Sequence, residues 1–301
     1  MFPELKRLTL EDRPALLPLL AQAPQPTCDY SFASLYIWQD CEVPSYAMLD
    51  GSLCILLEPR GALPYFLQPL GGDKSLETFR ACLERSGRVS RAGESLVSRL
   101  DSREFRIVPL RDNSDYLYRL SDLASLEGKK YDGKRNQINK FTRNHPDFEF
   151  RKLTELDLEP ALKVFATWAR DREKAGAQAL EPDLSVECQT KVLKRAFEGY
   201  RGLGMIGGGI FVGGELKGFS IGSELNPKTA VIHIQYADAS LPGIYQAVLW
   251  QACRNLFQGY ELINLEEDLG IPGLRKTKLS YHPLCIEPKF KITLRPAAQE
   301  I

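Results

Sequence analysis

The sequence predicts a mixed-sheet α/β fold made of two similar halves, and three observations point to it. Residues 8–16 and 153–162 each combine a short strand end, an aspartate at a helix N-cap and a proline in the first helical turn. The two-residue turns 50–51 and 213–214 each separate two apolar segments, which is typical of a β-hairpin. In the second copy, hairpins flank a strand–loop–helix–strand crossover, which makes the sheet mixed. Chance similarity of short segments is the alternative to a duplication.

The first half is expected to hold the first hairpin, further strands and a helix. Leu76, Phe79 and Leu83 recur at helical spacing, which predicts a helix over residues 75–85. The strands, each a short apolar run, are expected at residues 46–57 (the hairpin), 65–68, 105–110 and 116–120. We therefore place a first domain at residues 1–125.

A basic segment, residues 126–145, is expected to form the helix that links this domain to a second one at residues 126–301. Its positively charged side chains are Lys129, Lys130, Lys134, Arg135, Lys140 and Arg143. Such a stripe on a helix is suited to binding phosphates, including those of RNA or CoA. A helix face that is simply exposed to water is the alternative.

The second half is expected to contain more helix than the first. Its helices are predicted at residues 159–174, at residues 186–200, and from Pro242 to a stop at Gly259. Its strands, again short apolar runs, are predicted at residues 148–152, 210–221 (the second hairpin), 230–236, 262–265 and 284–294. A parallel pair on either side of the last helix would complete the mixed sheet.

Composition argues against several classes of protein. The 39 lysines and arginines balance 39 aspartates and glutamates, which disfavours a nucleic-acid coat protein or a basic membrane-surface protein. The seven cysteines include no C-x-x-C pair, so we expect reduced, buried thiols in a cytoplasmic protein. Three histidines are too few for a multi-histidine site, and we expect no bound metal. No signal peptide or membrane span is predicted.

The most informative segment is residues 263–283, in which acids and then bases follow an apolar strand. The charged residues on either side of the turn 270–273 are Glu266, Glu267, Asp268, Arg275, Lys276 and Lys278. Adjacent carboxyl groups raise one another's pKa, which suits a general base that works near neutral pH. An acidic turn exposed to solvent and followed by a basic edge strand is the alternative.

Two further features are candidates for a binding pocket. The loop 237–241 precedes a helix, and free N–H groups there would suit a phosphate or an oxyanion, although ordinary helix capping also explains this loop. His233 lies within a predicted strand and is either a base or a half-buried, hydrogen-bonded histidine. No nucleophile with a base and an acid is evident from the sequence.

Three segments together resemble a known bacterial family. They are residues 264–283, residues 130–141, and residues 232–238 followed by residues 243–246. The family comprises uncharacterised bacterial proteins related to the C-terminal domain of phosphatidylglycerol lysyltransferases. The resemblance covers nearly the whole chain from Phe32 onward. It implies a tandem GNAT-like acyltransferase fold, as in the Fem transferases of peptidoglycan synthesis.

The resemblance also implies an acyl- or aminoacyltransferase. Relatives move an aminoacyl group from tRNA to an amine or hydroxyl group, and more distant GNAT enzymes use acyl-CoA. We therefore expect acyl-CoA or aminoacyl-tRNA as the donor, a small amine or hydroxyl acceptor, no tightly bound cofactor and no DNA partner. The alternative is a non-catalytic GNAT-like protein that binds a ligand or RNA. Gln235 favours this alternative, because it stands where relatives are expected to carry glutamate.

The expected mechanism is direct attack of the acceptor on the donor, without a covalent intermediate on the protein. Glu267 or Asp268 is the expected base, and the other expected catalytic residues are Arg275, Lys278 and Tyr281. The expected donor-binding residues are Gly243, Tyr245, Gln246, Lys134, Arg135 and Asn136. The other pocket residues are expected to be His233, Gln235, Asp238 and Asn264.

Overall fold

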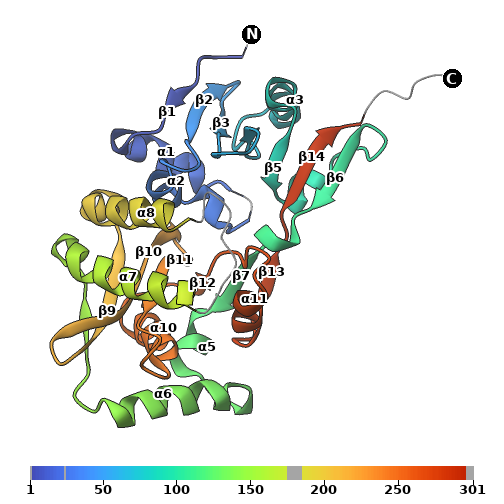
Figure 1. The fold of residues 1–301 in the computed structure, drawn as a ribbon. Coiled ribbons are helices and arrows are strands. Elements are labelled where there is room, and N and C mark those ends of the chain that lie inside the picture. The colour runs from blue at the N-terminus through green and yellow to red at the C-terminus, as the bar shows by residue number, and fades with distance from the viewer. Residues whose placement is uncertain (1, 24, 175–184, 296–301) are drawn as a thin grey trace.

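The computed structural model describes residues 2–23, 25–174 and 185–295, and it contains two seven-stranded sheets (Figure 1). The strands of the first sheet are β1 (Lys6–Arg7), β2 (Ser45–Leu49), β3 (Ser52–Leu57), β4 (Tyr65–Phe66), β5 (Val89–Ala92), β6 (Phe105–Pro109) and β14 (Phe290–Leu294). Their spatial order is β1-β2-β3-β4-β5-β14-β6. The pair β4–β5 is parallel and the other pairs are antiparallel, so the sheet is mixed.

The second sheet is mixed in the same way. Its strands are β7 (Asp115–Arg119), β8 (Glu149–Lys152), β9 (Ile206–Val212), β10 (Glu215–Asn226), β11 (Thr229–Ala237), β12 (Leu262–Asn264) and β13 (Cys285–Glu287). Their spatial order is β13-β7-β12-β11-β10-β9-β8, and only β11 and β12 among these described neighbours run parallel. The predicted mixed α/β fold is therefore confirmed.

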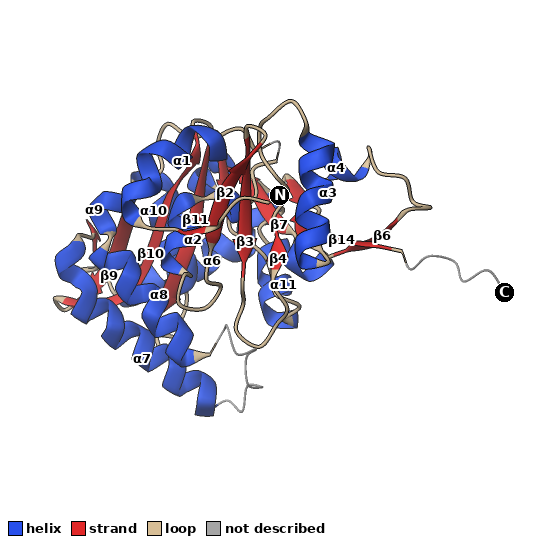
Figure 2. Ribbon diagram, turned by 90° about the horizontal axis from the view of Figure 1, so that it is seen from above, coloured by secondary structure: helices blue, strands red, loops and turns tan. Residues whose placement is uncertain are grey.

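Helices cover the sheets on both sides. They are α1 (Arg13–Leu20), α2 (Phe32–Ile37), α3 (Ser75–Ser86), α4 (Glu94–Val97), α5 (Leu120–Ser125), α6 (Asp132–Asn144), α7 (Leu158–Lys174), α8 (Val186–Glu198), α9 (Tyr200–Leu203), α10 (Ile244–Asn255) and α11 (Pro272–Leu279). On β10, Phe219 packs with α7 while the neighbouring Gly218 faces α10, so these helices lie on opposite faces of the second sheet (Figure 2). Within the described ranges, no helix is long and apolar enough to cross a membrane.

Two strands cross between the halves. β7 follows the first sheet in the chain but lies in the second sheet, between β12 and β13. β14 comes from the other end of the chain and lies in the first sheet, between β5 and β6. A boundary after residue 125 therefore does not separate the two sheets. The halves also share one hydrophobic core, in which Leu16 and Phe32 cluster with Phe165 and Phe219.

Both predicted hairpins form around the glycine-containing turns. Asp50 and Gly51 have φ angles of 49° and 77°, and Gly213 and Gly214 have 59° and 80°. These left-handed angles are those that a type I′ turn requires. The hairpins β2–β3 and β9–β10 therefore form from local sequence, and the second of them places the long strand β10 between β9 and β11.

A bulge in β11 prepares the site described below, because His233 is the extra residue of that strand: Ile221 of β10 pairs with Ile234, and Gly222 pairs with Ile232. The register between β10 and β11 shifts between Ile221 and Gly222. A Cβ atom on Gly222 would lie 2.1 Å from the carbonyl oxygen of Val231, so only glycine permits this close approach of the two strands. Ser223, the residue after Gly222 on β10, lies within hydrogen-bond distance of the bulged His233 and faces the junction of the two halves.

A disulfide joins the halves covalently. Cys41, in the loop after α2, is bonded to Cys188 on α8, and their Cα atoms lie 6.3 Å apart. Our expectation of reduced thiols throughout is therefore wrong for this pair, because the fold brings together two cysteines that are 147 positions apart in the sequence. The free cysteines of the described chain are Cys28, Cys54, Cys82, Cys253 and Cys285.

Removal of this bond should destabilise the oxidised protein. Cys41→Ser should lower the free energy of unfolding by about 2–4 kcal/mol, because the bond closes a long loop in the unfolded chain. Urea unfolding with and without reductant measures this: reductant should weaken the wild type and leave Cys41→Ser unchanged. Cys285→Ser, which removes a free thiol, is the control and should behave as the wild type does. Identical curves for oxidised and reduced wild type would contradict the prediction.

Candidate active site

The acidic segment after β12 is a tight turn that separates its three carboxyl groups. Glu266 has a φ of 58° and Leu269 a φ of 55°, which is uncommon for residues other than glycine. The buried side chain of Asn264 supports this backbone, because its Oδ1 accepts a hydrogen bond from the N–H of Glu266 at 2.6 Å. Glu266, Glu267 and Asp268 consequently have different partners.

Asp268 is the centre of an ion-pair network. It is fully buried, and its oxygens accept hydrogen bonds from Arg111 (3.1 Å), Tyr116 (2.6 Å), the N–H of Gly270 (2.9 Å) and Arg275 (2.9 and 2.6 Å). Burial alone would raise the pKa of Asp268, but the hydrogen bonds from Arg275 and Tyr116 hold it well below its usual range. A carboxylate that is so well satisfied accepts a proton poorly, so Asp268 does not fit the role of a base.

Arg275 and Lys278 bind the same turn. They lie on α11, a helix that begins at Pro272, and not on an edge strand. Arg275 is occupied by Asp268, and Lys278 donates hydrogen bonds to the carbonyl oxygens of Leu265 and, at 2.6 Å, Glu267. Burial lowers the pKa of Lys278. Both cations therefore hold the acidic turn to α11.

Tyr281 and Lys134 form a further contact behind this turn. The ammonium of Lys134 lies 3.9 Å from the centre of the Tyr281 ring and donates to the hydroxyl of Ser280 at 2.6 Å. Burial raises the pKa of Tyr281, which makes its hydroxyl a weak acid. The carbonyl of Tyr281 accepts from Tyr131 at 3.1 Å. Both residues therefore attach α6 to α11.

The network around Asp268 gives a pH-dependent stability. Asp268→Asn should lower the free energy of unfolding by about 2 kcal/mol at neutral pH. In this variant Arg111 and Arg275 lose the carboxylate with which they pair. Their side chains are 43% and 33% exposed, so water solvates them and limits the loss of stability. Because folding lowers the pKa of Asp268, its contribution is present above the ordinary value of 3.8 and is lost as the pH falls through the folded value.

Urea unfolding of Asp268→Asn and of the wild type, at neutral pH and below pH 3.8, measures this contribution. The difference between the two proteins should shrink in acid. Asp101→Asn removes a carboxylate from an exposed ion pair with Arg103 and is the matched control, with no change expected. A difference that is the same at both pH values would refute the assignment.

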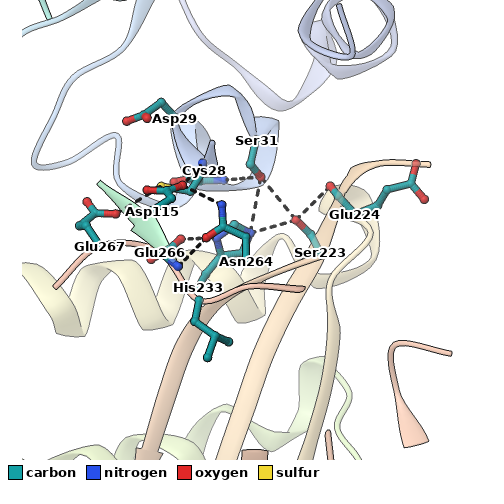
Figure 3. A network of polar contacts seen from close by, with 12 residues as sticks. Cys28, Asp29, Ser31, Asp115, Ser223, Glu224, His233, Asn264, Glu266 and Glu267 are labelled. Carbon is teal, nitrogen blue, oxygen red and sulfur yellow. Dashed lines mark hydrogen bonds and ion pairs between the residues drawn. The ribbon is translucent and has the colours of Figure 1, made fainter. Parts of the chain in front are cut away.

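A second group of residues forms a chain of hydrogen bonds where the halves meet (Figure 3). The side chain of His233, on β11, is fully buried, with Nδ1 at 2.8 Å from Oε1 of Glu266 and Nε2 at 2.9 Å from the hydroxyl of Ser223. Ser31, from the first half, reaches the same point: its hydroxyl lies 3.4 Å from that of Ser223 and 3.5 Å from Nε2. The result is a hydrogen-bonded chain of serine, imidazole and carboxylate, and the hydroxyl of a second serine, Ser31, lies beside its serine end.

The environment of Glu266 sets the direction of this chain. Burial raises the pKa of Glu266, and the hydrogen bond from His233 opposes that rise. When Glu266 is ionised, it accepts the proton of Nδ1, so the lone pair of the imidazole lies on Nε2 and faces Ser223. In this tautomer the imidazole accepts the hydrogen bond of Ser223 at Nε2.

A buried charge cluster lies beside this chain and is centred on Lys289. Its ammonium is 2.6 Å from Asp29 and 2.7 Å from Asp115. Asp115 also accepts from the backbone N–H of Cys28 at 2.6 Å and from the amide of Asn264 at 2.7 Å. Asn264 therefore connects the Lys289 cluster to the turn that carries Glu266 (Figure 3).

Cys28, Asp115 and Glu267 are the group of described residues whose ligand atoms converge, within 4.8 Å of one another. Lys289 already places a positive charge there, 3.7 Å from the Cys28 sulfur. Burial raises the pKa of Cys28, and the charge of Asp115 raises it further. The thiol donates a hydrogen bond to Glu267 at 3.3 Å, so Cys28 is part of the hydrogen-bonded cluster around Lys289.

The start of α10, where we expected a donor, is occupied by the protein. Gly243 has a φ of 91°, and a Cβ there would lie 2.1 Å from the carbonyl oxygen of Gln137 on α6. This glycine therefore permits α6 to pack against the first turn of α10. Gln246, one turn along, is half-buried.

The remaining residues near α10 have local partners. Tyr245 donates its O–H to the carbonyl of Ala237 at 3.0 Å, and Gln235 donates its amide N–H to the carbonyl of Tyr245 at 3.1 Å. Asp238 accepts from the N–H of Ser240 at 3.0 Å and closes the loop. The structure thus gives these residues a role in shaping the β11–α10 connection.

The other expected donor-binding residues lie on α6. Arg135 donates to the carbonyls of Leu126 and Gly128 and pairs with Asp132, so it stabilises the start of the helix. Asn136 is exposed. It lines a surface cavity of 370 Å³ together with Asn139, Thr142 and Arg143. Of the donor-binding residues expected on α6, Asn136 alone lines this cavity.

Sequence reasoning identified His233 as a pocket residue and missed its partners. Ser223 is 10 positions from His233, whereas Ser31 is 202 positions away and no local pattern connects them. Glu266 was visible in the acidic segment but could not be distinguished from Glu267 and Asp268. The one usable signal for Ser223 is the glycine before it in a strand, since such a glycine often marks a bulge.

Comparison with known proteins assigns the family. The family described as "Phosphatidylglycerol lysyltransferase, C-terminal" matches residues 20–293. A conserved protein of unknown function from Bacteroides thetaiotaomicron has 28% identity and a TM-score of 0.89, over 98% of this chain and 100% of that chain. L-PGS from Bacillus licheniformis has 16% identity and a TM-score of 0.66, over 98% of this chain and 94% of that chain.

Two further proteins are similar to this chain. A curated but uncharacterised protein of Mycoplasmoides gallisepticum is 25% identical over 181 residues, which cover 60% of this chain and 56% of that protein. A tandem GNAT protein from clavulanic acid biosynthesis matches with a TM-score of 0.51 and 12% identity, over 98% of this chain and 99% of that chain. The predicted tandem GNAT-like fold is thereby confirmed. The chain belongs to the family of phosphatidylglycerol lysyltransferase C-terminal domains.

Proposed function

We propose that this protein transfers an aminoacyl group from aminoacyl-tRNA to an amine or hydroxyl group of a small acceptor, with His233 as the general base. The observation that carries the proposal is the buried Ser223–His233–Glu266 chain at the junction of the halves. The family membership supports transfer as the reaction class. A donor made in the cytoplasm fits a cytoplasmic location, which we also propose.

The chemistry follows from the orientation of the imidazole. An attacking amine or hydroxyl must lose a proton as it bonds to the donor carbonyl, and the acceptor of that proton in this proposal is Nε2 of His233, which lies 2.9 Å from the Ser223 hydroxyl. Glu266 lies 2.8 Å from Nδ1 and stabilises the imidazolium that forms, and the full burial of the imidazole strengthens this charge interaction. Asn264 fixes the backbone of Glu266 and thereby the direction of the hydrogen bond to Nδ1.

The choice of tRNA over CoA rests on the outer face of α6. Lys140 and Arg143 are exposed, and Arg143 lines the 370 Å³ cavity with Asn136 and Asn139. α6 lies at the edge of the second half, where a long polyanion has free access to it (Figure 1). RNA phosphates bind such a surface through several lysines and arginines at once.

Loss of these charges should weaken tRNA binding in a salt-dependent way. For Lys140→Ala with Arg143→Ala, the slope of log affinity against log salt should fall by about 0.7–0.9 for each phosphate that the variant no longer neutralises. Filter binding or fluorescence anisotropy over a range of salt concentrations measures the slope. Lys291→Ala, a change on β14 in the first sheet, is the matched control. An unchanged slope in the double variant would place the RNA elsewhere.

The proposed function is tested by transfer itself. The full chain is incubated with labelled aminoacyl-tRNA or with labelled acetyl-CoA, together with a panel of small amines and alcohols, and the products are separated by mass. Product formed from aminoacyl-tRNA alone supports the proposal. Product formed from acetyl-CoA alone would show that the donor is an acyl-CoA and not an aminoacyl-tRNA. Salt-dependent tRNA binding without any product would favour a non-catalytic RNA-binding protein.

A further inference from the structure

The hydroxyl of Ser223 is placed as a nucleophile is placed in covalent acyl transfer. A base lies at hydrogen-bond distance from it, 2.9 Å, and a carboxylate orients that base from its other nitrogen at 2.8 Å. This order of groups, hydroxyl then imidazole then carboxylate, is recognised by geometry and not by position in the sequence. The three residues come from β10, β11 and the turn after β12, which are neighbouring segments of one sheet (Figure 3).

We propose, on the basis of the transfer function above, that Ser223 carries the acyl or aminoacyl group as an ester during the reaction. In the first step the Ser223 oxygen bonds to the donor carbonyl carbon, and its proton passes to Nε2 of His233. The bond from that carbon to the donor oxygen breaks, and the departing oxygen takes the proton from His233. In the second step the acceptor attacks the ester, its proton passes to His233, and Ser223 recovers its hydroxyl.

The stability of the fold gives no reason to keep this chain. A buried imidazole and carboxylate lose their hydration, and apolar side chains of similar volume commonly stabilise a protein as well or better. Phe219, Ile221 and Ile234, on the same two strands, show that apolar side chains fill the core beside this chain. The extra residue of the bulge in β11 is His233 itself, and bulges are frequent next to active sites.

Ser223 is preferred to Ser31 as the nucleophile. Ser31 is the N-cap of α2, where its oxygen accepts from the N–H of Ser34 at 3.2 Å, and it lies 3.5 Å from Nε2. Ser31 instead covers Ser223 from the first half, and the two side chains are 1% and 2% exposed. A donor therefore reaches Ser223 only when the segment that carries Ser31 moves away from β10.

The test is to trap the ester. The full chain is mixed with p-nitrophenyl acetate or with aminoacyl-tRNA, quenched in acid and analysed by intact mass, and the modified peptide is then sequenced. One acyl group on Ser223, removed by hydroxylamine, is the expected result. Ser223→Ala should carry none, and Ser223→Cys should form a thioester at the same position, which shows that a variant site still folds. Ser240→Ala, in an exposed loop, should be labelled as the wild type is.

The outcomes separate this inference from the proposed function. Transfer at the wild-type rate by Ser223→Ala, with no acyl group found on the chain, would establish direct attack and overturn the inference while leaving the transferase function in place. An ester on Ser223 without transfer to any acceptor would support the inference and refute the function. An acyl group found on Ser31 would also overturn the inference. So would a protein that transfers the aminoacyl group but is modified by neither reagent.

Discussion

Replacing His233 by glutamine should lower the rate of transfer by about 10²–10⁴-fold, which is the usual contribution of a general base. Glutamine has a similar length and can still donate an N–H to Glu266, but it has no group that accepts a proton from Ser223 or from an acceptor. The hydrogen bonds of the buried chain are thus partly kept while its chemistry is removed. The rate of product formation from aminoacyl-tRNA measures the effect.

The matched control for this variant is His145→Gln. His145 follows α6 and contacts the ring of Phe141 at 5.1 Å, away from the Ser223–His233–Glu266 chain. Its replacement should leave the rate within a factor of about two, as expected for a surface position. The melting temperature of both variants is compared with that of the wild type. A transfer rate in His233→Gln equal to that of His145→Gln would exclude His233 as the base.

The parts of the fold that sequence predicts well depend on neighbouring residues. The turns at Gly51 and Gly214 need left-handed backbone, and the helix around Phe79 has an apolar stripe, so each forms from a pattern of a few residues. The exchange of β7 and β14 between the sheets has no such pattern. It depends on contacts between segments far apart in the sequence, such as the pairing of β14 with β5 and β6 and of β7 with β12.

In the candidate site, too, the sequence predicts a local feature but not the long-range contacts that give its residues their roles. Glu266, Glu267 and Asp268 are three adjacent acids in sequence, and composition gives no reason to assign them different roles. The fold adds Arg111 and Tyr116 to Asp268, and His233 to Glu266, from segments that lie 33 to 157 positions away. Asp268 therefore becomes a stable ion-pair partner and Glu266 the partner of a base. Sequence locates the turn, and only the tertiary contacts distinguish its residues.

Lys289→Met should lower the free energy of unfolding by about 3–5 kcal/mol at neutral pH, the usual cost of removing one partner of a buried ion pair. Burial alone would lower the pKa of Lys289, but the charges of Asp115 and Asp29 raise it, so the ammonium is present in the folded protein. Methionine fills a similar volume and leaves both carboxylates without their shared cation. Arg91 lies 3.0 Å from Asp29 and still neutralises that carboxylate, so Asp115 is the one left without a cation.

Protonation or replacement of the other carboxylate, Asp115, should restore part of the stability that Lys289→Met loses. Burial raises the pKa of Asp115, and Lys289 opposes that rise, so the pKa should rise further in Lys289→Met. The variant should therefore regain stability as the pH falls through this raised value, and Lys289→Met with Asp115→Asn should recover part of the loss at neutral pH. Lys291→Met, on β14 two positions after Lys289 and outside the cluster, is the control. Urea unfolding of the wild type, Lys289→Met, Asp115→Asn and the double variant gives the coupling between Lys289 and Asp115. A double variant no more stable than Lys289→Met would mean that packing, and not an uncompensated charge, explains the burial of this lysine.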